Sequence, residues 1–257
     1  MTDMSIAKQL HLERAMARRP RSVAILGLGL TLKTYIDLAK GLGGRRAIAE
    51  EIWGINAIGD VVACDRIFHM DDVRIQEIRA EANPTGNIAA MLKWLKKHPG
   101  PVYTSQRHSD YPGLVEFPLA DVLNSCTGQK YMNSTAACAI AYAVHIGVAK
   151  IMCFGMDFTL PNSYHAEQGR ACVEFWLGFA RARGIDIVCP KESSLLDACE
   201  PFERRIYGYD AVELAFAGAP GEERVTMTPR EQLPTAEEIE RRYDHSRHPN
   251  PLMRDKD

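Results

Sequence analysis

Residues 22–42 read SVAILGLGLTLKTYIDLAKGL, and this stretch decides the fold. Its first five residues form a short β-type run, which ends at Gly27-Leu28-Gly29. The apolar residues that follow recur at the spacing of a helix. The stretch therefore predicts a strand, a glycine turn and a helix, in the order that begins a parallel βαβ unit.

Strand and helix signals continue to alternate beyond this stretch. We expect further strands at residues 51–55, 65–70, 101–105, 114–118, 150–156 and 185–190, and helices at 75–97, 136–147, 167–184 and 193–198. Residues 150–156 are almost continuously apolar, as in a central parallel strand that is covered on both faces. The predicted fold class is α/β, a Rossmann-like three-layer sandwich with a mostly parallel sheet and an irregular C-terminal tail.

The pattern divides the chain into three parts. Residues 1–20 are expected to form an amphipathic helix with Ile6, Leu10 and Ala15 on one face. Residues 21–200 are expected to form the Rossmann-like nucleotide-binding domain. Residues 201–257 form a C-terminal extension that we expect to be loosely attached and partly disordered, because its pattern is weak and it is rich in Pro, Glu and Arg.

Composition argues against several classes of protein. The net charge is −2, with 31 basic and 33 acidic residues, so the overall charge does not indicate a polyanionic partner. The seven cysteines are scattered without a CxxC or CxxH pair, which predicts reduced thiols and no structural zinc. The N-terminus lacks a secretory signal and no apolar run is long enough to span a bilayer, so we expect a cytoplasmic protein without a membrane partner.

Ligands of open α/β sheets bind beyond the carboxyl ends of the strands, so polar residues at those ends are the site candidates. The loop of residues 27–31 joins Gly27 and Gly29 to a helix N-terminus, which suits a phosphate, although a tight turn needs the same glycines. Asn56 ends the next strand, where its amide could bind a base or sugar or simply form a turn.

Polar groups also follow the third strand and precede the alanine-rich helix. Asp71 and Asp72 suit a divalent metal or ribose hydroxyls, while an N-cap on the following helix would explain one of them. Asn133 and Ser134 lie where one of them would cap the helix at 136–147, and where both would help to hold a phosphate.

The candidate catalytic residues are Asp157, which ends the apolar strand, and His165 in the loop predicted after it. His165 is the candidate general base because imidazole titrates near neutral pH and a loop is accessible, although most loop histidines are merely solvated. Lys33, Arg107 and Lys130 are candidates to neutralise a leaving pyrophosphate, with plain surface residues as the alternative.

Taken together, these motifs resemble a known superfamily. GLGLTLKTY, WGINA, FHMDD, YMNSTAACAIAYAVHIGVAKIMCFGMDF and SSLLDA occur in this order. They resemble the bacterial sialyltransferases of glycosyltransferase family 42, the motility accessory factor glycosyltransferases and the archaeal 6-hydroxymethylpterin diphosphokinases. The chain looks like a phage-type member, and the resemblance covers residues 22–199, with its most specific part at 133–158.

The resemblance implies a nucleotide held by Gly27, Gly29, Thr31, Asn56, Asn133 and Ser134. It also implies that a histidine after the Gly-x-Asp-Phe motif is the base that deprotonates the acceptor hydroxyl. His165 is the nearest match, at a shorter spacing than in the sialyltransferases. Leu30 and Thr31 stand where the family has Pro and Ser, so the hydroxyl is kept and the rigid proline is not.

Three functions follow as hypotheses. The leading one is a nucleotide-dependent transferase, specifically a glycosyltransferase that moves a sugar from a nucleotide-sugar donor to the hydroxyl of a small molecule, a glycan or a modified DNA base. The second is a magnesium-dependent diphosphokinase that uses a nucleoside triphosphate on a pterin-like alcohol, with Asp71, Asp72 and Asp157 on the metal. The third is a non-catalytic nucleotide-binding or virion-associated protein. A homo-oligomer is compatible with each, in the host cytoplasm if the source is a phage.

Overall fold

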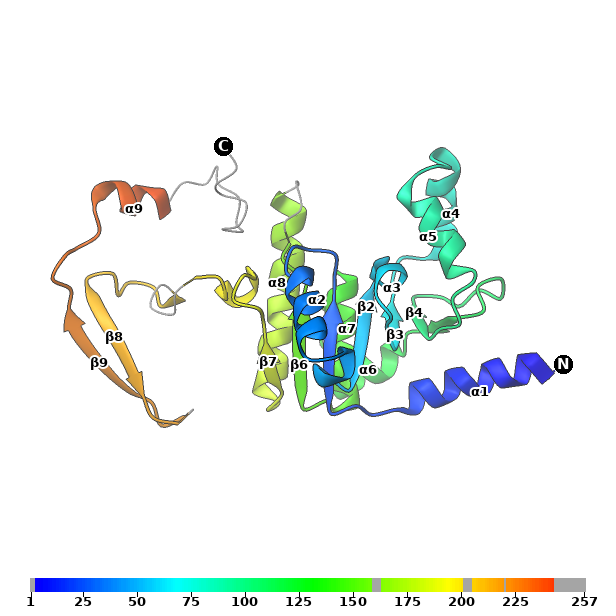
Figure 1. The fold of residues 1–257 in the computed structure, drawn as a ribbon, viewed down its shortest axis with the longest axis horizontal. Helices are drawn as coiled ribbons and strands as arrows, with labels where there is room; N and C mark the ends of the chain where they lie inside the picture. Colours follow the sequence, from blue (N-terminus) through cyan, green and yellow to red (C-terminus); the bar gives the residue numbers. More distant parts are fainter. Residues whose placement is uncertain (1–2, 159–162, 201–204, 220, 243–257) are drawn as a thin grey trace.

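A computed structural model describes residues 3–158, 163–200, 205–219 and 221–242. Its centre is a seven-stranded sheet in the order β5-β4-β3-β2-β1-β6-β7, in which every neighbouring pair is parallel (Figure 1). The strands are β1 Ser22–Leu26, β2 Glu51–Ile55, β3 Arg66–Phe68, β4 Val102–Thr104, β5 Leu114–Glu116, β6 Lys150–Phe154 and β7 Asp186–Val188. The predicted α/β fold class and its parallel sheet are confirmed.

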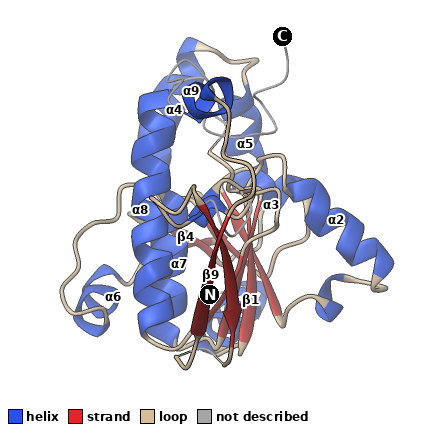
Figure 2. Ribbon diagram, turned by 90° about the vertical axis from the view of Figure 1, so that its left-hand side faces the viewer, coloured by secondary structure: helices blue, strands red, loops and turns tan. Residues whose placement is uncertain are grey.

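Helices cover both faces of the sheet, as Figure 2 shows for α2, α7 and α8. One face carries α6 Leu119–Ser125, α7 Thr135–Ile146 and α8 Ser163–Ala182, and the other carries α2 Leu32–Gly41, α3 Ile58–Val61, α4 Val73–Ala82 and α5 Asn87–Leu95. Successive side chains of a strand point alternately into the two layers of helices that cover the sheet. In β1, Val23 and Ile25 pack on the α7 side, whereas Ala24 and Leu26 pack on the α2 side.

The order of the strands fixes where a ligand would bind. β1 pairs with β2 on one side and with β6 on the other. The chain leaves β1 through α2 on one face of the sheet and reaches β6 through α7 on the opposite face. The carboxyl ends of β1 and β6 therefore form the topological switch point, and the N-termini of α2, α7 and α8 lie at the same edge.

The single helix predicted at residues 75–97 is wrong, because two helices, α4 and α5, cover this region. The break falls at Asn83-Pro84-Thr85-Gly86. Proline lacks the N–H that would continue a helical hydrogen-bond pattern, and the N-cap of α5 is Gly86 in an extended conformation. A short 3-10 turn, Arg45–Ala47, follows α2, and another, Leu195–Asp197, stands where the short helix at 193–198 is predicted.

The N-terminal helix is present as α1, Asp3–Ala17, but its buried face differs from the predicted one. Leu10 is 45% exposed, whereas Leu12 is buried in the core of the α7 layer and Met16 packs against it. The expected face of Ile6, Leu10 and Ala15 is therefore wrong at Leu10. No helix among the residues described is long and apolar enough to cross a membrane.

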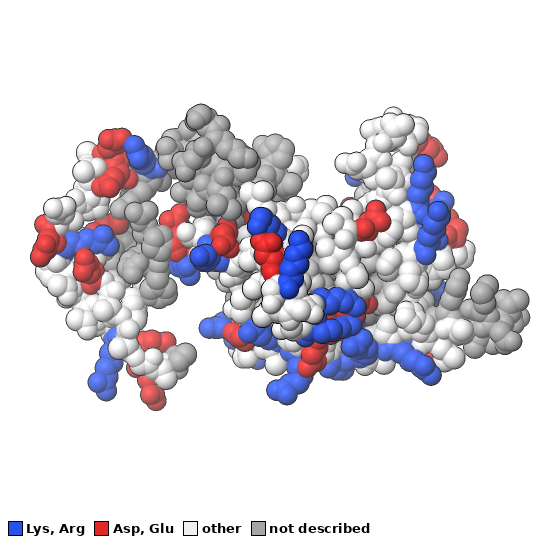
Figure 3. All heavy atoms as spheres, in the orientation of Figure 1, with Lys and Arg blue, Asp and Glu red and all other residues white. Residues whose placement is uncertain are grey.

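The C-terminal extension contains a hairpin that the sequence did not predict. Its strands, β8 Val212–Ala217 and β9 Arg224–Pro229, form a two-stranded antiparallel sheet, and α9 Ala236–Arg242 follows them. Figure 1 shows the hairpin lying apart from the sheet, at the end of the molecule opposite α1. Figure 3 shows charges of both signs on this part, and basic side chains gathered low on the body.

Candidate functional site

The loop after β1 packs directly on the loop after β6. The amide of Gly27 donates to the carbonyl of Phe154 over 2.8 Å, and the amide of Gly29 donates to Gly155 over 2.7 Å. A Cβ on Gly27 would lie 2.3 Å from the Gly155 oxygen, and one on Gly29 would lie 2.7 Å from Oδ2 of Asp157. Both glycines are therefore required by the close approach of two backbones, whether or not a phosphate binds here.

Thr31 and Asp157 join these two loops. The Asp157 carboxylate accepts hydrogen bonds from the Thr31 amide over 2.7 Å and from the Thr31 hydroxyl over 2.6 Å. The same hydroxyl accepts from the Gly155 amide, and the Ser194 hydroxyl donates to the Asp157 carbonyl. Thr31 is 2% exposed and Asp157 1%. In this structure the anion at the N-terminus of α2 is thus the protein's own carboxylate.

This arrangement changes the role that Asp157 can have. A buried carboxylate with both oxygens hydrogen-bonded to Thr31 is not accessible to a substrate, although the sequence made it a catalytic candidate. We interpret Asp157 as a positioning residue that holds the first loop against β6. The signal in the sequence was a charged residue at the end of the most apolar strand, since such a group needs a partner when it is buried.

A cavity of about 580 Å³ opens at the carboxyl ends of β3, β4 and β5, beside the N-terminus of α7. It brings together three predicted site residues, Asp71, Asn133 and Ser134, with the candidate cation Lys130. Thr135, from the same turn as Asn133 and Ser134, adds a hydroxyl, and Ser105 adds one that the sequence did not predict. Apolar walls come from Met70, Phe117, Leu119, Met132 and Cys138.

The N-terminus of α7 makes this cavity suitable for an anion. Ser134 is the N-cap, with extended backbone angles and a side chain that accepts from the Ala137 amide. The first amides of a helix have no partner within the helix, so those of Thr135 and Ala136 are available to a ligand. The helix dipole favours negative charge at this end, and Lys130 adds a positive side chain at the same cavity.

Asn56 belongs to a different group of residues. It has a left-handed conformation, with φ of 55°, and its Oδ1 lies 3.1 Å from Nδ1 of His69. His69 is 1% exposed, burial lowers its pKa, and its Nε2 has no hydrogen-bond partner among the residues described. Asn56 does not line the cavity at α7, so its predicted contact with a nucleotide has no support from this geometry.

The two adjacent aspartates face different partners. Asp71 lines the cavity, whereas Asp72 caps α4: its Oδ1 accepts from the Arg74 amide over 2.7 Å and its Oδ2 lies 3.3 Å from Nε2 of His108. The described residues include no group of three or more His, Cys, Asp and Glu side chains that could hold a metal ion. In this structure Asp71, Asp72 and Asp157 thus face different surroundings, Asp72 toward His108 and Asp157 toward Thr31.

His165 lies in the first turn of α8 and not in a loop, which corrects the prediction. Residues 159–162, which precede this helix, lie outside the described residues. His165 is exposed. One turn later, the carbonyl of Gln168 accepts a hydrogen bond from the side-chain amide of Asn133 over 3.3 Å. The N-termini of α7 and α8 are thus neighbours, and His165 belongs to the helix that contacts Asn133, one of the residues that line the cavity.

The other candidate cations lie elsewhere. Lys33 on α2 forms an ion pair with Asp37, one turn along the same helix. Arg107 lies in the exposed turn after β4 and does not line the cavity.

No protein-family model matches the chain, and no curated protein matches it.

Proposed function

We propose that the chain is a nucleotide-dependent transferase, most specifically a glycosyltransferase, that holds the phosphates of its donor at the N-terminus of α7. The observation that carries the proposal is the cavity at this helix, where Asp71, Lys130, Asn133 and Ser134 meet. Its volume of about 580 Å³ lies within the range of small-molecule sites. The family resemblance of the sequence supports the same class of reaction.

Each group at the cavity has a chemical role in this proposal. The α7 amides and Lys130 bind the donor phosphates and stabilise the negative charge that grows on the nucleotide as it leaves. Asp71 accepts from hydroxyls of the donor, and Met70, Phe117 and Met132 pack against its apolar surface. His165, on the neighbouring helix, takes the proton from the acceptor hydroxyl as the new glycosidic bond forms.

A thermal-shift panel tests the proposal. The purified chain is heated with CMP, UDP, GDP, ATP and nucleotide sugars, with and without magnesium, because a ligand that binds the native state raises its stability. We expect stabilisation by one nucleotide and its sugar, without a requirement for metal. Lys130→Gln should remove most of this shift, whereas Lys97→Gln, at an exposed lysine outside the cavity, should retain it.

The alternative functions give different results in the same experiment. Stabilisation by ATP that requires magnesium would favour the diphosphokinase, and no shift with any nucleotide would favour the non-catalytic protein. Hydrolysis of the stabilising nucleotide sugar then tests the transferase chemistry. His165→Ala should lower the turnover number for hydrolysis of the nucleotide sugar, in which water is the acceptor. The thermal shift should stay at the wild-type value, because the proposed base acts on the acceptor and not on donor binding.

A further inference from the structure

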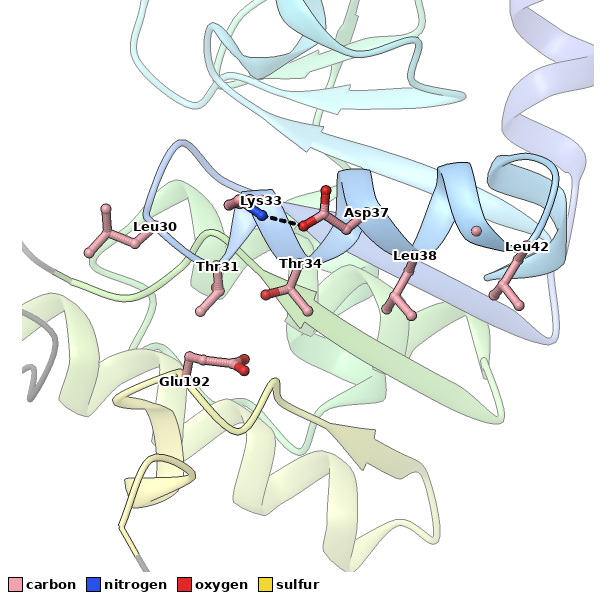
Figure 4. Close-up of a pocket in the computed structure, with 9 residues that line it drawn as sticks. Leu30, Thr31, Lys33, Thr34, Asp37, Leu38, Leu42 and Glu192 are labelled. Atoms are coloured by element: carbon pink, nitrogen blue, oxygen red, sulfur yellow. Dashed lines mark hydrogen bonds and ion pairs between the residues drawn. The ribbon is translucent and has the colours of Figure 1, made fainter.

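A second cavity, the α2 groove, lies on the face of the sheet opposite α7. It has a volume of about 820 Å³, which lies within the range of small-molecule sites. Its apolar walls include Leu30, Leu38 and Leu42, which are 46%, 41% and 56% exposed, and Thr34 and Glu192 add polar groups. Figure 4 shows the side chains of Leu38, Leu42 and Thr34 extending from α2 toward the side on which Glu192 lies. The proposed chemistry at α7 does not use this groove.

Glu192 presents a carboxylate oxygen to the groove that lacks a hydrogen-bond donor. Its Oε2 is buried and has no partner among the described residues, although the residue as a whole is partly exposed. The turn that carries Glu192 is held by its neighbours. The Ser193 amide donates to the carbonyl of Pro190 over 2.9 Å, and the Ser194 hydroxyl donates to the carbonyl of Asp157 over 2.8 Å. A buried carboxylate oxygen without a donor is unfavourable, so this fixed position favours an occupant that donates to it.

The N-terminus of α2, at one end of the groove, is not a free anion site. The amides of residues 32–34 donate to the carbonyls three residues earlier. The Thr31 amide donates to the carboxylate of Asp157, and the Lys33 ammonium is paired with Asp37. This end of the groove therefore offers an anionic ligand neither free amides nor an unpaired cation.

The charges that line the groove favour a cation instead. The lining carries one ammonium, on Lys33, and two carboxylates, on Asp37 and Glu192. Because Lys33 and Asp37 pair with each other, the charge left without a partner is that of Glu192. A protonated amine supplies both the opposite charge and the missing donor, and charge-assisted hydrogen bonds are stronger than neutral ones.

We propose that the α2 groove is a ligand site for a small molecule that carries a protonated amine on an apolar body. The ammonium donates to Oε2 of Glu192 and to the Thr34 hydroxyl, and the apolar body packs on Leu38 and Leu42. Because Leu30 also lines the groove, the bound molecule contacts the loop between β1 and α2. This inference is independent of the proposed nucleotide site at α7.

Titration of the full chain with hexylamine, hexanol and hexanoate, followed by amide NMR of the isotope-labelled protein, tests the site. The three compounds share an apolar chain and differ in the charge of the polar end. Hexylamine should shift the signals of residues 30–42 and 191–194 and bind at least about tenfold more tightly than hexanol, because only the ammonium pairs with Glu192. Hexanoate should not shift these signals.

Two variants separate the charge from the apolar wall. Glu192→Gln keeps the shape of the side chain and should weaken hexylamine binding by at least about tenfold, while the affinity for hexanol stays at the wild-type value and shows that the groove is intact. Glu81→Gln, at an exposed position on α4, should bind hexylamine as the wild type does. Leu38→Ala/Leu42→Ala should weaken the binding of hexylamine and hexanol alike, because the apolar chain loses part of the surface that covers it.

Three results would overturn the proposal. One is the absence of saturable shifts at residues 30–42 with hexylamine up to about 10 mM, a concentration that reveals even weak fragment binding. Another is equal affinity of the wild type and Glu192→Gln for hexylamine. The third is binding of hexanol or hexanoate to the wild type as tightly as hexylamine, because the groove would then not recognise the positive charge.

Discussion

At the scale of single residues, the contact that organises the switch point is the one between Thr31 and Asp157. The Thr31 hydroxyl donates to Asp157 and accepts from the Gly155 amide, so one oxygen satisfies groups from two loops. All of these groups are buried. The loss of this hydroxyl would leave a charged oxygen and an amide without partners in a region that water does not reach.

Thr31→Val should therefore lower the free energy of unfolding by about 2–3 kcal/mol. Thr31→Ser keeps the hydroxyl and should lose much less. Urea denaturation of both variants and the wild type measures the difference. Equal stability of Thr31→Val and Thr31→Ser would show that the hydroxyl does not stabilise the two loops.

His69 predicts how stability depends on pH. Burial lowers its pKa below the ordinary value of 6.5, although Asp71 acts in the opposite direction, so the unfolded chain binds a proton more readily than the folded one. The stability contributed by neutral His69 is fully present above pH 6.5, the ordinary pKa that the unfolded chain has. It is lost as the pH falls below 6.5 toward the lower pKa of the folded state. His69→Gln should flatten this loss in denaturation series between about pH 7.5 and about pH 5.5.

His11→Gln, at an exposed histidine, serves as the control and should retain the wild-type slope. A slope in His69→Gln that equals the wild-type slope would contradict the account. His98 and His145 also have pKa values lowered by burial, so the slope should flatten in His69→Gln and not vanish.

Residue-scale chemistry was only partly predictable from the sequence. Glycines at 27 and 29, Asp71 and the Asn133-Ser134 pair could be selected because strand ends and helix starts are visible in the pattern. The pairing of Thr31 with Asp157 could not, since the two are 126 positions apart and depend on β1 and β6 being neighbours. The same limit applies to the contact between Asn56 and His69, because it depends on the register of β2 and β3.

At the scale of elements, the N-terminus of α7 has two separate functions in this account, a helix cap and an anion site. Ser134→Ala should cost about 1 kcal/mol of stability through the lost cap. Ser134→Asp keeps a capping oxygen and should remain close to the wild type in stability, but its negative charge should repel a bound phosphate. Thermal unfolding with and without the nucleotide measures both effects.

If Ser134→Asp bound the nucleotide as tightly as the wild type, the phosphate would not lie at this helix.

The helices and strands themselves were predicted well where apolar runs were long, as in β6 and α7. The division between α4 and α5 was missed because apolar spacing continues across Pro84. The hairpin was missed because its strands alternate over only six residues within a polar segment.

At the scale of the whole molecule, a buried ion pair connects several layers. Nε of Arg66 in β3 lies 2.7 Å from Oε2 of Glu51 in β2, and both residues are 1% exposed. The same guanidinium donates to the hydroxyls of Tyr103 and Tyr142 and to the carbonyl of Arg18, which follows α1. This network joins the sheet to α7 and to the N-terminal segment.

Arg66→Met should therefore destabilise the whole chain by about 3 kcal/mol, because it breaks the buried ion pair and leaves Glu51 with the partly exposed Arg18 as its charged partner. The double variant Glu51→Gln/Arg66→Met removes both charges and should recover part of the loss. Denaturation followed by circular dichroism checks both variants. A single variant that unfolds like the wild type, or a double variant less stable than Arg66→Met, would contradict this role.

The most direct test of the central claim is calorimetric titration of the nucleotide selected by the thermal panel into the wild type and two serine variants. Ser105→Glu adds a negative charge at an exposed position that lines the cavity, and Ser109→Glu adds the same charge at an exposed position outside it. We predict that Ser105→Glu weakens binding by at least about tenfold, or about 1.4 kcal/mol, and that Ser109→Glu binds as the wild type does. Equal affinities for all three proteins would contradict a phosphate site at the N-terminus of α7.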